Sequence, residues 1–227
     1  MKKFAIALAI LALAAPAFAV SPNVVISQVY GGGGSSSATA TYNQDYVELY
    51  NNSAVAVNIS GWTIQYGSAT GAWGSSASNI FTFPVGSFID ACGYVLCAFA
   101  VPSSGGAAIP VVADYTQLTG PAMGGVSGKI GLFNAVNTNL ACGLEIPGTL
   151  VDKVAYGTAN CAETTAVGVL SVTTGAVRNG GGTIDTDSNL ADFTVVTGPV
   201  PHNRASTTGC PVPAESQSWG ALKSTFR

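Results

Sequence analysis

The sequence predicts an all-β protein built as a sandwich of two packed sheets. Short segments rich in Val, Ile, Tyr and Phe alternate with turns rich in Gly, Ser and Asn along most of the chain. Apolar residues nowhere keep a helical period over about ten residues. Several segments instead alternate apolar and polar residues, as strands buried on one face do. About seven or more such strands, separated by turns, favour a β-sandwich.

Residues 45–66 show this pattern most clearly and predict strand, turn, strand, turn, strand. Val47 and Leu49 lie on one face of the first strand, and Trp62 and Ile64 share one face of the last. Asn-Asn-Ser and Ser-Gly supply the two turns. We therefore expect a meander whose core residues are Val47, Leu49, Trp62 and Ile64, with Trp62 enclosed between the two layers.

Five further segments predict strands, namely 23–30, 80–83, 93–99, 129–133 and 150–156. A run of four glycines follows the first of them. Phosphate-binding loops close with Gly-Lys-Ser/Thr and open a helix, whereas this run leads through serines into another strand. We therefore interpret it as a flexible loop.

Four motifs in the first part of the chain carry a resemblance to a known family. They are VISQVYGG at 25–32, DYVELYN at 45–51, SGWTIQY at 60–66 and GYVL at 93–96. With these motifs the chain up to about residue 134 resembles the lamin tail domain family, which implies an immunoglobulin-like sandwich. Ala91-Cys92 departs from the family, which usually has Gly-Gly before the Tyr of the last motif. Family members occur alone or fused to exported hydrolases, so the resemblance implies an accessory or surface module without assigning a ligand.

The expected organisation has four parts. Residues 1–19 form a bacterial signal peptide, with Lys2 and Lys3, an apolar stretch and an Ala-Phe-Ala cleavage site. The sandwich covers 20–140. An extension at 141–210 resembles that of exported bacterial family members and packs on the same domain, and 211–227 forms a C-terminal tail. Two interpretations of the tail remain open. It is a docking or sorting peptide, because Trp219, Leu222 and Phe226 have helical spacing, or it is an ordinary frayed terminus.

The charge balance excludes one class of partner. Removing the leader leaves six basic residues against eleven acidic ones, a net charge of −5 without any basic cluster. Nucleic-acid binding depends on clustered Lys and Arg, so we expect none. No segment beyond the leader is long and apolar enough to predict a membrane span. Charged residues make up only 8% of the chain, which leaves little repulsion between copies and favours self-association.

Five cysteines enter an oxidising compartment if the chain is exported. We expect a disulfide between Cys142 and Cys161, closing a loop of about 20 residues. Cys92 and Cys97 pair with each other, or one of them pairs with Cys210. The odd count leaves one thiol, either buried or available for a bond between chains. Zinc is not expected, because the spacing lacks Cys-x-x-Cys and the chain has a single His.

Calcium is the one cofactor that the sequence suggests. Asp185, Asp187, Asn189 and Asp192 alternate carboxylate and amide oxygens, which are ligands that calcium prefers. The second half of a calcium loop is missing, because Leu190 and Val196 stand where its Gly and Glu belong. The alternatives are that these side chains cap local turns, or that Arg178 pairs with one of the carboxylates and pins the extension to the sandwich.

Candidate catalytic residues are few. His202 is the single imidazole and lies between Pro201 and Asn203 in a predicted loop, without a Gly-x-Ser-x-Gly motif in the chain. Asp45 and Glu48 suggest a carboxylate pair, but three positions apart on a strand they face opposite sides. We therefore expect no enzyme, and assign no catalytic residue.

The sequence thus predicts a secreted, extracellular or cell-surface module of the lamin-tail type, non-catalytic, with a binding or structural role. The expected partner is an extracellular protein or glycan. One alternative is a self-assembling surface or fibre subunit, motivated by the low charge and the unpaired cysteine. The other is an accessory domain or weak hydrolase that acts on extracellular phosphoester or glycan substrates. Exposed aromatic side chains could bind sugars or a partner, with Tyr30, Tyr42, Tyr46, Tyr50, Trp73 and Tyr115 as the candidates. In a chain that is 48% apolar, we expect most of these rings to lie in the core instead.

Overall fold

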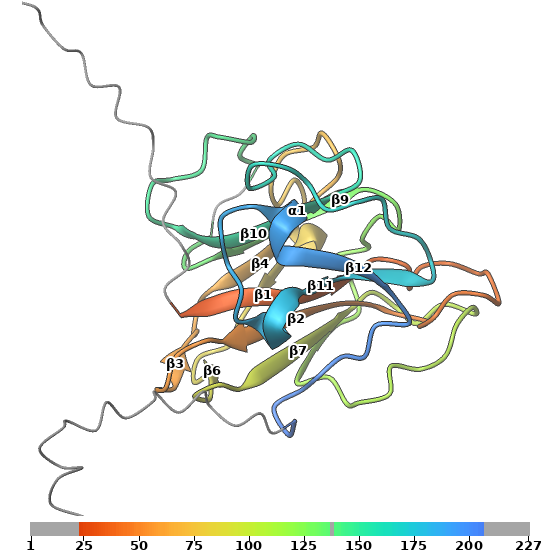
Figure 1. Ribbon diagram of the computed structural model, residues 1–227, viewed down its shortest axis with the longest axis horizontal. Helices are drawn as coiled ribbons and strands as arrows, with labels where there is room; N and C mark the ends of the chain where they lie inside the picture. Colours follow the sequence, from red (N-terminus) through yellow and green to blue (C-terminus); the bar gives the residue numbers. More distant parts are fainter. Residues whose placement is uncertain (1–22, 137–138, 207–227) are drawn as a thin grey trace, which may run out of the picture.

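The computed structural model describes residues 23–136 and 139–206 (Figure 1). Its strands are β1 (Val24–Tyr30), β2 (Asp45–Asn51), β3 (Val57–Asn58), β4 (Thr63–Gly67), β5 (Ile80–Thr82), β6 (Phe88–Ile89), β7 (Tyr94–Phe99), β8 (Tyr115–Gln117), β9 (Gly128–Phe133), β10 (Leu150–Tyr156), β11 (Thr174–Arg178) and β12 (Phe193–Thr197). Three short helices are η1 (Ala77–Asn79), η2 (Asn179–Gly182) and α1 (Asn189–Asp192). The expected signal peptide, the tail after 210 and Cys210 lie outside the described residues.

Two sheets form the sandwich. The larger has six strands in the order β12-β11-β1-β2-β7-β8, and the smaller has four in the order β10-β9-β4-β5. A two-stranded ribbon of β3 and β6 lies at one end (Figure 1). Neighbouring strands run antiparallel except β7 and β8, which are parallel. The predicted all-β sandwich is confirmed. Within the described residues, no helix has the length and apolar character that a bilayer crossing requires.

The stretch 45–66 does not form the expected meander. Its first strand, β2, pairs with β1 and β7 in the larger sheet, whereas its last strand, β4, pairs with β5 and β9 in the smaller. The short strand between them pairs with β6 in the ribbon. The apolar alternation therefore located the strands correctly, but the chain crosses from one layer to the other between them.

The core lies between the two sheets and is apolar. Val47, Leu49 and Ile64 are fully buried in it. Trp62 is not enclosed between the layers as expected, because it is only partly buried and packs against the edge of this core. Trp62 lies between the exposed turn residue Gly61 and the first residue of β4. A side chain at that position faces solvent on one side. Trp73 is instead the fully buried tryptophan among the described residues.

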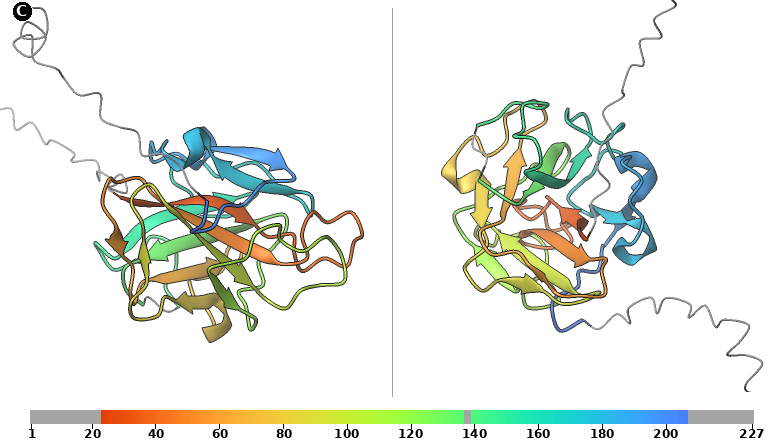
Figure 2. Two further views of the ribbon diagram at one scale, coloured as in Figure 1. Left: turned by 90° about the horizontal axis from the view of Figure 1, so that it is seen from below. Right: turned by 90° about the vertical axis from the view of Figure 1, so that its left-hand side faces the viewer.

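The extension contributes strands to the larger sheet. β11 pairs with β1, and β12 pairs with β11 to form one edge of the sheet. Both lie together along one margin of the molecule in the two views of Figure 2. We did not predict them from the sequence, because β11 begins Thr-Gly-Ala and a turn-rich segment precedes β12.

Candidate functional site

A groove of about 360 Å³ opens at the end of the sandwich where β1 and β10 begin. Apolar side chains form most of its lining, and two asparagines stand among them. The lining residues are Asn23, Val24, Val57, Trp62, Asn134, Gly148, Leu150 and Val151. None of these described residues carries a titratable side chain, so the groove offers apolar contact and amide hydrogen bonding rather than acid–base chemistry.

Local backbone contacts hold Trp62 at the groove. Its amide N–H donates to the Ile59 carbonyl at 3.0 Å, which closes a turn through Ser60 and Gly61. Gly61 has φ of +76°, a conformation that favours glycine. The Phe83 N–H donates to the Trp62 carbonyl at 2.9 Å. The indole is therefore fixed by the turn and by the core edge while one side of it remains accessible.

A buried ionic cluster around Arg178 joins the extension to the sandwich. The Arg178 Nη2 lies 2.7 Å from Asp152 Oδ2 on β10, and Nη1 lies 3.2 Å from Asp185 Oδ1. The Asp192 Oδ2 is 3.7 Å from Nη1. Arg178 Nε also donates to the Ile26 carbonyl on β1 at 2.8 Å. The alternative in which Arg178 pairs with a carboxylate of the predicted calcium cluster is therefore present in the structure.

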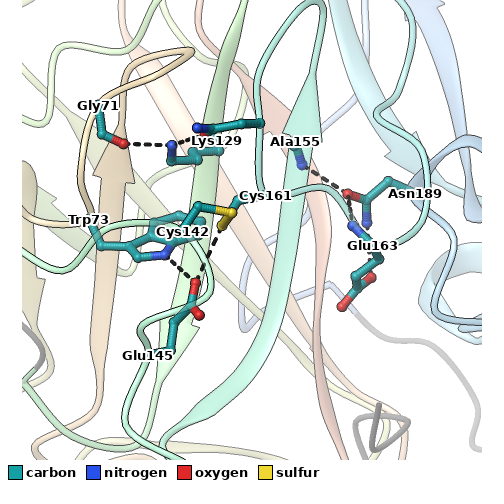
Figure 3. Close-up of a disulfide and its surroundings, with 10 residues drawn as sticks. Gly71, Trp73, Lys129, Cys142, Glu145, Ala155, Cys161, Glu163 and Asn189 are labelled. Atoms are coloured by element: carbon teal, nitrogen blue, oxygen red, sulfur yellow. Dashed lines mark hydrogen bonds between the residues drawn. A yellow bond between two sulfur atoms is a disulfide. The ribbon is translucent and has the colours of Figure 1, made fainter. Parts of the chain in front are cut away.

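The four predicted calcium ligands have other partners. Asp185 faces Arg178. Asp192 accepts from the Thr186 N–H at 2.9 Å and the Thr186 hydroxyl at 2.6 Å. Asn189 Oδ1 accepts from the Ala155 N–H at 3.0 Å (Figure 3). Its Nδ2 donates to the Lys153 carbonyl at 2.9 Å. Asp187 has φ of +56° in the turn before α1. These contacts match turn capping and strand bridging better than a shared ion.

A different trio of carboxylates converges beside Arg178. Oxygens of Asp152, Glu163 and Asp185 lie within 4.8 Å of one another. Burial, reinforced by the charge of Asp152, raises the pKa of Glu163 to about 9, so this carboxyl is neutral near pH 7. Burial also raises the pKa of Asp152, and the Arg178 guanidinium opposes that rise. Protonation of Glu163 thus reduces the negative charge that Arg178 must balance.

His202 contacts Glu48 rather than a nucleophile. Its Nδ1 lies 3.2 Å from Glu48 Oε2, and its ring stacks on Tyr94 at 4.6 Å between centroids. The hydrogen bond to Glu48 raises the pKa of His202 above its usual value. The Ser27 hydroxyl donates to the other oxygen of Glu48 at 2.6 Å. Because the carboxylate stands between serine and histidine, the imidazole cannot take a proton from that serine, as a Ser-His-Asp triad requires.

Asp45 and Glu48 do not form a carboxylate pair. Asp45 accepts from the N–H groups of Gly33 at 2.8 Å and Met123 at 2.7 Å, whereas Glu48 faces His202. Burial raises the pKa of Asp45 to about 6. Both carboxylates are fully buried and satisfy backbone and side-chain donors, which is a structural role.

The expected disulfide between Cys142 and Cys161 is present (Figure 3). It lies on the outer face of the smaller sheet beside Trp73, whose indole N–H donates to Glu145 Oε1 at 2.6 Å. Lys129 donates to the Gly71 carbonyl at 2.6 Å and to Asn160 Oδ1. The expectation that Cys92 and Cys97 pair with each other is wrong, because Cys97 is a free thiol buried in the core.

The six candidate aromatic residues are mostly interior, as expected for most of them. Tyr30, Tyr42 and Tyr46 form a buried cluster, Tyr50 and Trp73 are buried, and Tyr115 is partly buried. The sequence missed Trp62 as a groove residue, since its alternation with Ile64 assigned it to the core. The sequence did contain a signal that Trp62 is partly exposed. It directly follows a Ser-Gly turn, and a residue there lies at the end of a strand, where the sheet stops.

Two mainly antiparallel sheets pack face to face. This arrangement defines the protein as an immunoglobulin-like β-sandwich module. Within that class the chain belongs to the Lamin Tail Domain family, whose model matches residues 18–158. This confirms the resemblance carried by the four sequence motifs.

A solved structure of a DUF4876 family protein from Bacteroides thetaiotaomicron has a similar fold. The match has a TM-score of 0.51 at 14% sequence identity and covers 86% of this chain and 75% of that chain. At this identity the likeness concerns the fold alone. No curated protein matches the chain.

Proposed function

We propose that this protein is an exported, non-catalytic binding module that contacts its ligand through the groove around Trp62. The observation that carries the proposal is the groove itself, an apolar concavity with a half-buried indole at one end of the sandwich. Loops and strand ends of a rigid β-sandwich are common places for binding residues. The leader-like residues 1–19 support export of the module.

The groove chemistry suits a glycan better than a charged ligand. An indole presents a flat apolar face to which the C–H face of a sugar ring can pack. The amides of Asn23 and Asn134 can donate to and accept from hydroxyl groups. Charged side chains are missing from the described lining residues, so a phosphorylated or strongly acidic ligand would lack a counter-charge. An extracellular protein segment is the competing ligand.

Three features argue against the hydrolase alternative. His202 lacks a nucleophile within its contacts, and the carboxylates Asp45 and Glu48 are occupied by the chain's own donors. The clustered acids near Arg178 are held in a buried network of ion pairs, and none of them is among the described residues that line the groove. A binding role therefore uses the exposed features of the module, whereas a catalytic role would require buried structural groups.

Tryptophan fluorescence and calorimetry test the proposal. The leader-free protein would carry Trp219→Phe, leaving Trp62 at the groove and Trp73 fully buried. Soluble oligosaccharides of the chitin, cellulose and peptidoglycan types serve as probes. We expect one class to change the Trp62 emission and to bind with an affinity that Trp62→Ala lowers by about tenfold or more, which is about 1.4 kcal/mol.

Val169→Ala is the matched control, because Val169 is 60% exposed and does not line the groove. It should leave sugar affinity unchanged. Binding that Trp62→Ala does not weaken would place the ligand elsewhere and overturn the assignment of the groove. Failure of every oligosaccharide, together with saturable binding of an extracellular protein that Trp62→Ala abolishes, would retain the groove and replace the ligand class.

A self-assembling subunit is the second candidate, favoured by the edge strand β12. Three of its five residues are exposed, and it leaves one edge of the larger sheet unpaired among the described strands. The unpaired cysteine no longer supports this reading, because Cys97 is buried. Sedimentation of the leader-free protein tests it. A monomer at high concentration would eliminate the subunit role.

A further inference from the structure

Lys129 on β9 belongs to the outer face of the smaller sheet, yet it is fully buried. The next residue, Ile130, packs in the core between the sheets, so the Lys129 side chain points to the opposite face. The cross-strand neighbours of Lys129 are small, Gly67 on β4 and Ala155 on β10. A Cβ at Gly67 would lie 2.7 Å from Lys129 Cε. The small neighbours therefore leave room for the lysine stem along the sheet.

The loop between β4 and η1 encloses the amine at the end of this stem. Lys129 Nζ donates to the Gly71 carbonyl at 2.6 Å and lies 5.3 Å from the centroid of the Trp73 ring (Figure 3). It also donates to the side-chain oxygen of Asn160. Both acceptors are neutral, and none of the ion pairs in the described part of the chain includes Lys129. Burial lowers the pKa of Lys129, and the charge of Glu145 opposes this.

The backbone around Asn160 is fixed by two further contacts. The Asn160 N–H donates to the Ala69 carbonyl at 2.8 Å, in the same loop that encloses the amine. The next residue, Cys161, is joined by the disulfide to Cys142. Asn160 itself is exposed, in contrast to Lys129. The site therefore holds a buried amine against the side-chain amide of a residue that solvent can reach.

We propose that the side chains of Lys129 and Asn160 join in an intramolecular amide bond. The uncharged Lys129 Nζ attacks Asn160 Cγ, which is one covalent bond from the oxygen that Nζ contacts. A bond forms between Nζ and Cγ, the bond between Cγ and Nδ2 breaks, and one proton passes from Nζ to Nδ2. The nitrogen of the asparagine amide leaves as ammonia, so the step consumes neither an oxidant nor a cofactor.

The site supplies the conditions that this reaction needs. An amine in free solution reacts with an amide extremely slowly, because an amide is a poor electrophile. Holding the two groups in one fold makes the step intramolecular, with an effective concentration of up to about 10⁵–10⁸ M for well-oriented groups. Enclosure of Lys129 Nζ favours the uncharged amine, which is the nucleophile. Solvent at the exposed Asn160 can carry the proton and take up the ammonia.

The amide bond would join β9 to the segment that follows β10, in the same region as the disulfide. Reductants open a disulfide, whereas they leave an amide intact. The smaller sheet would therefore stay cross-linked after the bond between Cys142 and Cys161 is reduced. The cross-link would also persist in the unfolded chain, where it limits the conformational freedom of residues 129–160.

Mass spectrometry of the leader-free protein tests the proposal. The protein is stored folded for a prolonged period, then reduced and alkylated in denaturant, so that no disulfide contributes to the result. We expect a mass below the sequence value by about 17 Da, the mass of one ammonia. Trypsin should fail to cut after Lys129, and the fragment that ends at Lys153 should remain joined to fragment 154–178, which carries Asn160.

Variants identify the two groups that react. Lys129→Met and Asn160→Ala should each have the full mass of its sequence, with no joined fragments. Asn58→Ala is the matched control, because Asn58 is exposed and accepts from the Ser60 N–H rather than from a lysine, and it should keep the deficit. A wild-type mass equal to the sequence value, with normal cutting after Lys129, would overturn the proposal whether or not the variants fold. So would a deficit that persists in Asn160→Ala.

Discussion

The core between the sheets and the ionic cluster around Arg178 are both buried, yet they are built by different means. The core holds apolar side chains such as Val47, Leu49 and Ile64 from strands that alternate regularly. The ionic cluster buries a guanidinium and several carboxylates from segments as far apart in sequence as β10 and α1. Burial in the first region follows local periodicity, whereas burial in the second depends on partners that arrive from distant parts of the chain.

The difference predicts unequal tolerance of substitution. An apolar core loses contact energy when a side chain is shortened, and its neighbours relax in part. A buried ion pair that loses one partner leaves a charge without compensation in a poorly solvated place. The ionic cluster should therefore be the more sensitive region, even though replacing all its charges together would cost less than removing one.

The largest expected effect is that of Arg178→Met, which keeps much of the side-chain volume but removes the charge. It should lower the free energy of unfolding by about 3–5 kcal/mol, because Asp152 and Asp185 lose their counter-ion. Urea denaturation of the leader-free protein measures this loss. Leu49→Ala, in the apolar core, should cost about 2–5 kcal/mol and serves as the reference.

Arg204→Met is the matched control, since Arg204 is exposed and its loss should change stability by about 0.5 kcal/mol. Equal, small losses for Arg178→Met and Arg204→Met would contradict the buried-pair account. The comparison between regions would also weaken if Leu49→Ala unfolded the protein while Arg178→Met did not.

The same contrast explains what the sequence could and could not predict. The strands β2, β7 and β10 were located within a residue or two, because short runs of β-branched and aromatic residues bounded by turn residues predict strands. The sheet that each strand joins depends on distant partner strands and not on the local sequence pattern. The expectation of a meander at 45–66 was therefore wrong. Trp62 fits the alternation of β4 but lies beyond the end of that strand, where the sandwich closes less tightly.

The site was harder to predict for a similar reason. Asp185, Asp187, Asn189 and Asp192 match half of a calcium motif because spacing alone cannot reveal which donors meet them. Arg178 and the strand β10 supply those donors from elsewhere in the fold. The disulfide between Cys142 and Cys161 was predicted correctly. Closeness in sequence alone was not a sufficient guide, because Cys97, which lies nearer to Cys92, is a free thiol.

A pH dependence from Glu163 is the second expected effect. Its pKa of about 9 in the folded protein exceeds the usual value, so the folded state holds a proton that the unfolded state releases. This contribution to stability is complete below the unfolded pKa and is lost as pH rises toward about 9. Thermal unfolding between pH 5 and 9 should therefore show Tm falling with pH, and Glu163→Gln should flatten that fall.

The raised pKa values of Asp45 and His202 act in the same direction, so the Glu163→Gln difference curve isolates the contribution of Glu163. Gln is the appropriate replacement, because it keeps an oxygen for the Asn189 Nδ2 donor at 2.9 Å and cannot ionise. An unchanged slope in Glu163→Gln would show that the carboxyl titrates normally. The ionic cluster would then carry one more negative charge than we infer.

The smallest expected effect is that of a chelator. If the chain's own N–H groups and Arg178 satisfy Asp185, Asn189 and Asp192, removing divalent ions should leave Tm unchanged within about 1 °C. Calorimetry of protein purified from its host, with and without EDTA, measures this. A fall in Tm that calcium alone restores would establish a structural ion among these oxygens. In that case Asp187→Asn should weaken the restoration, and the cluster would balance its carboxylates with a metal as well as with Arg178.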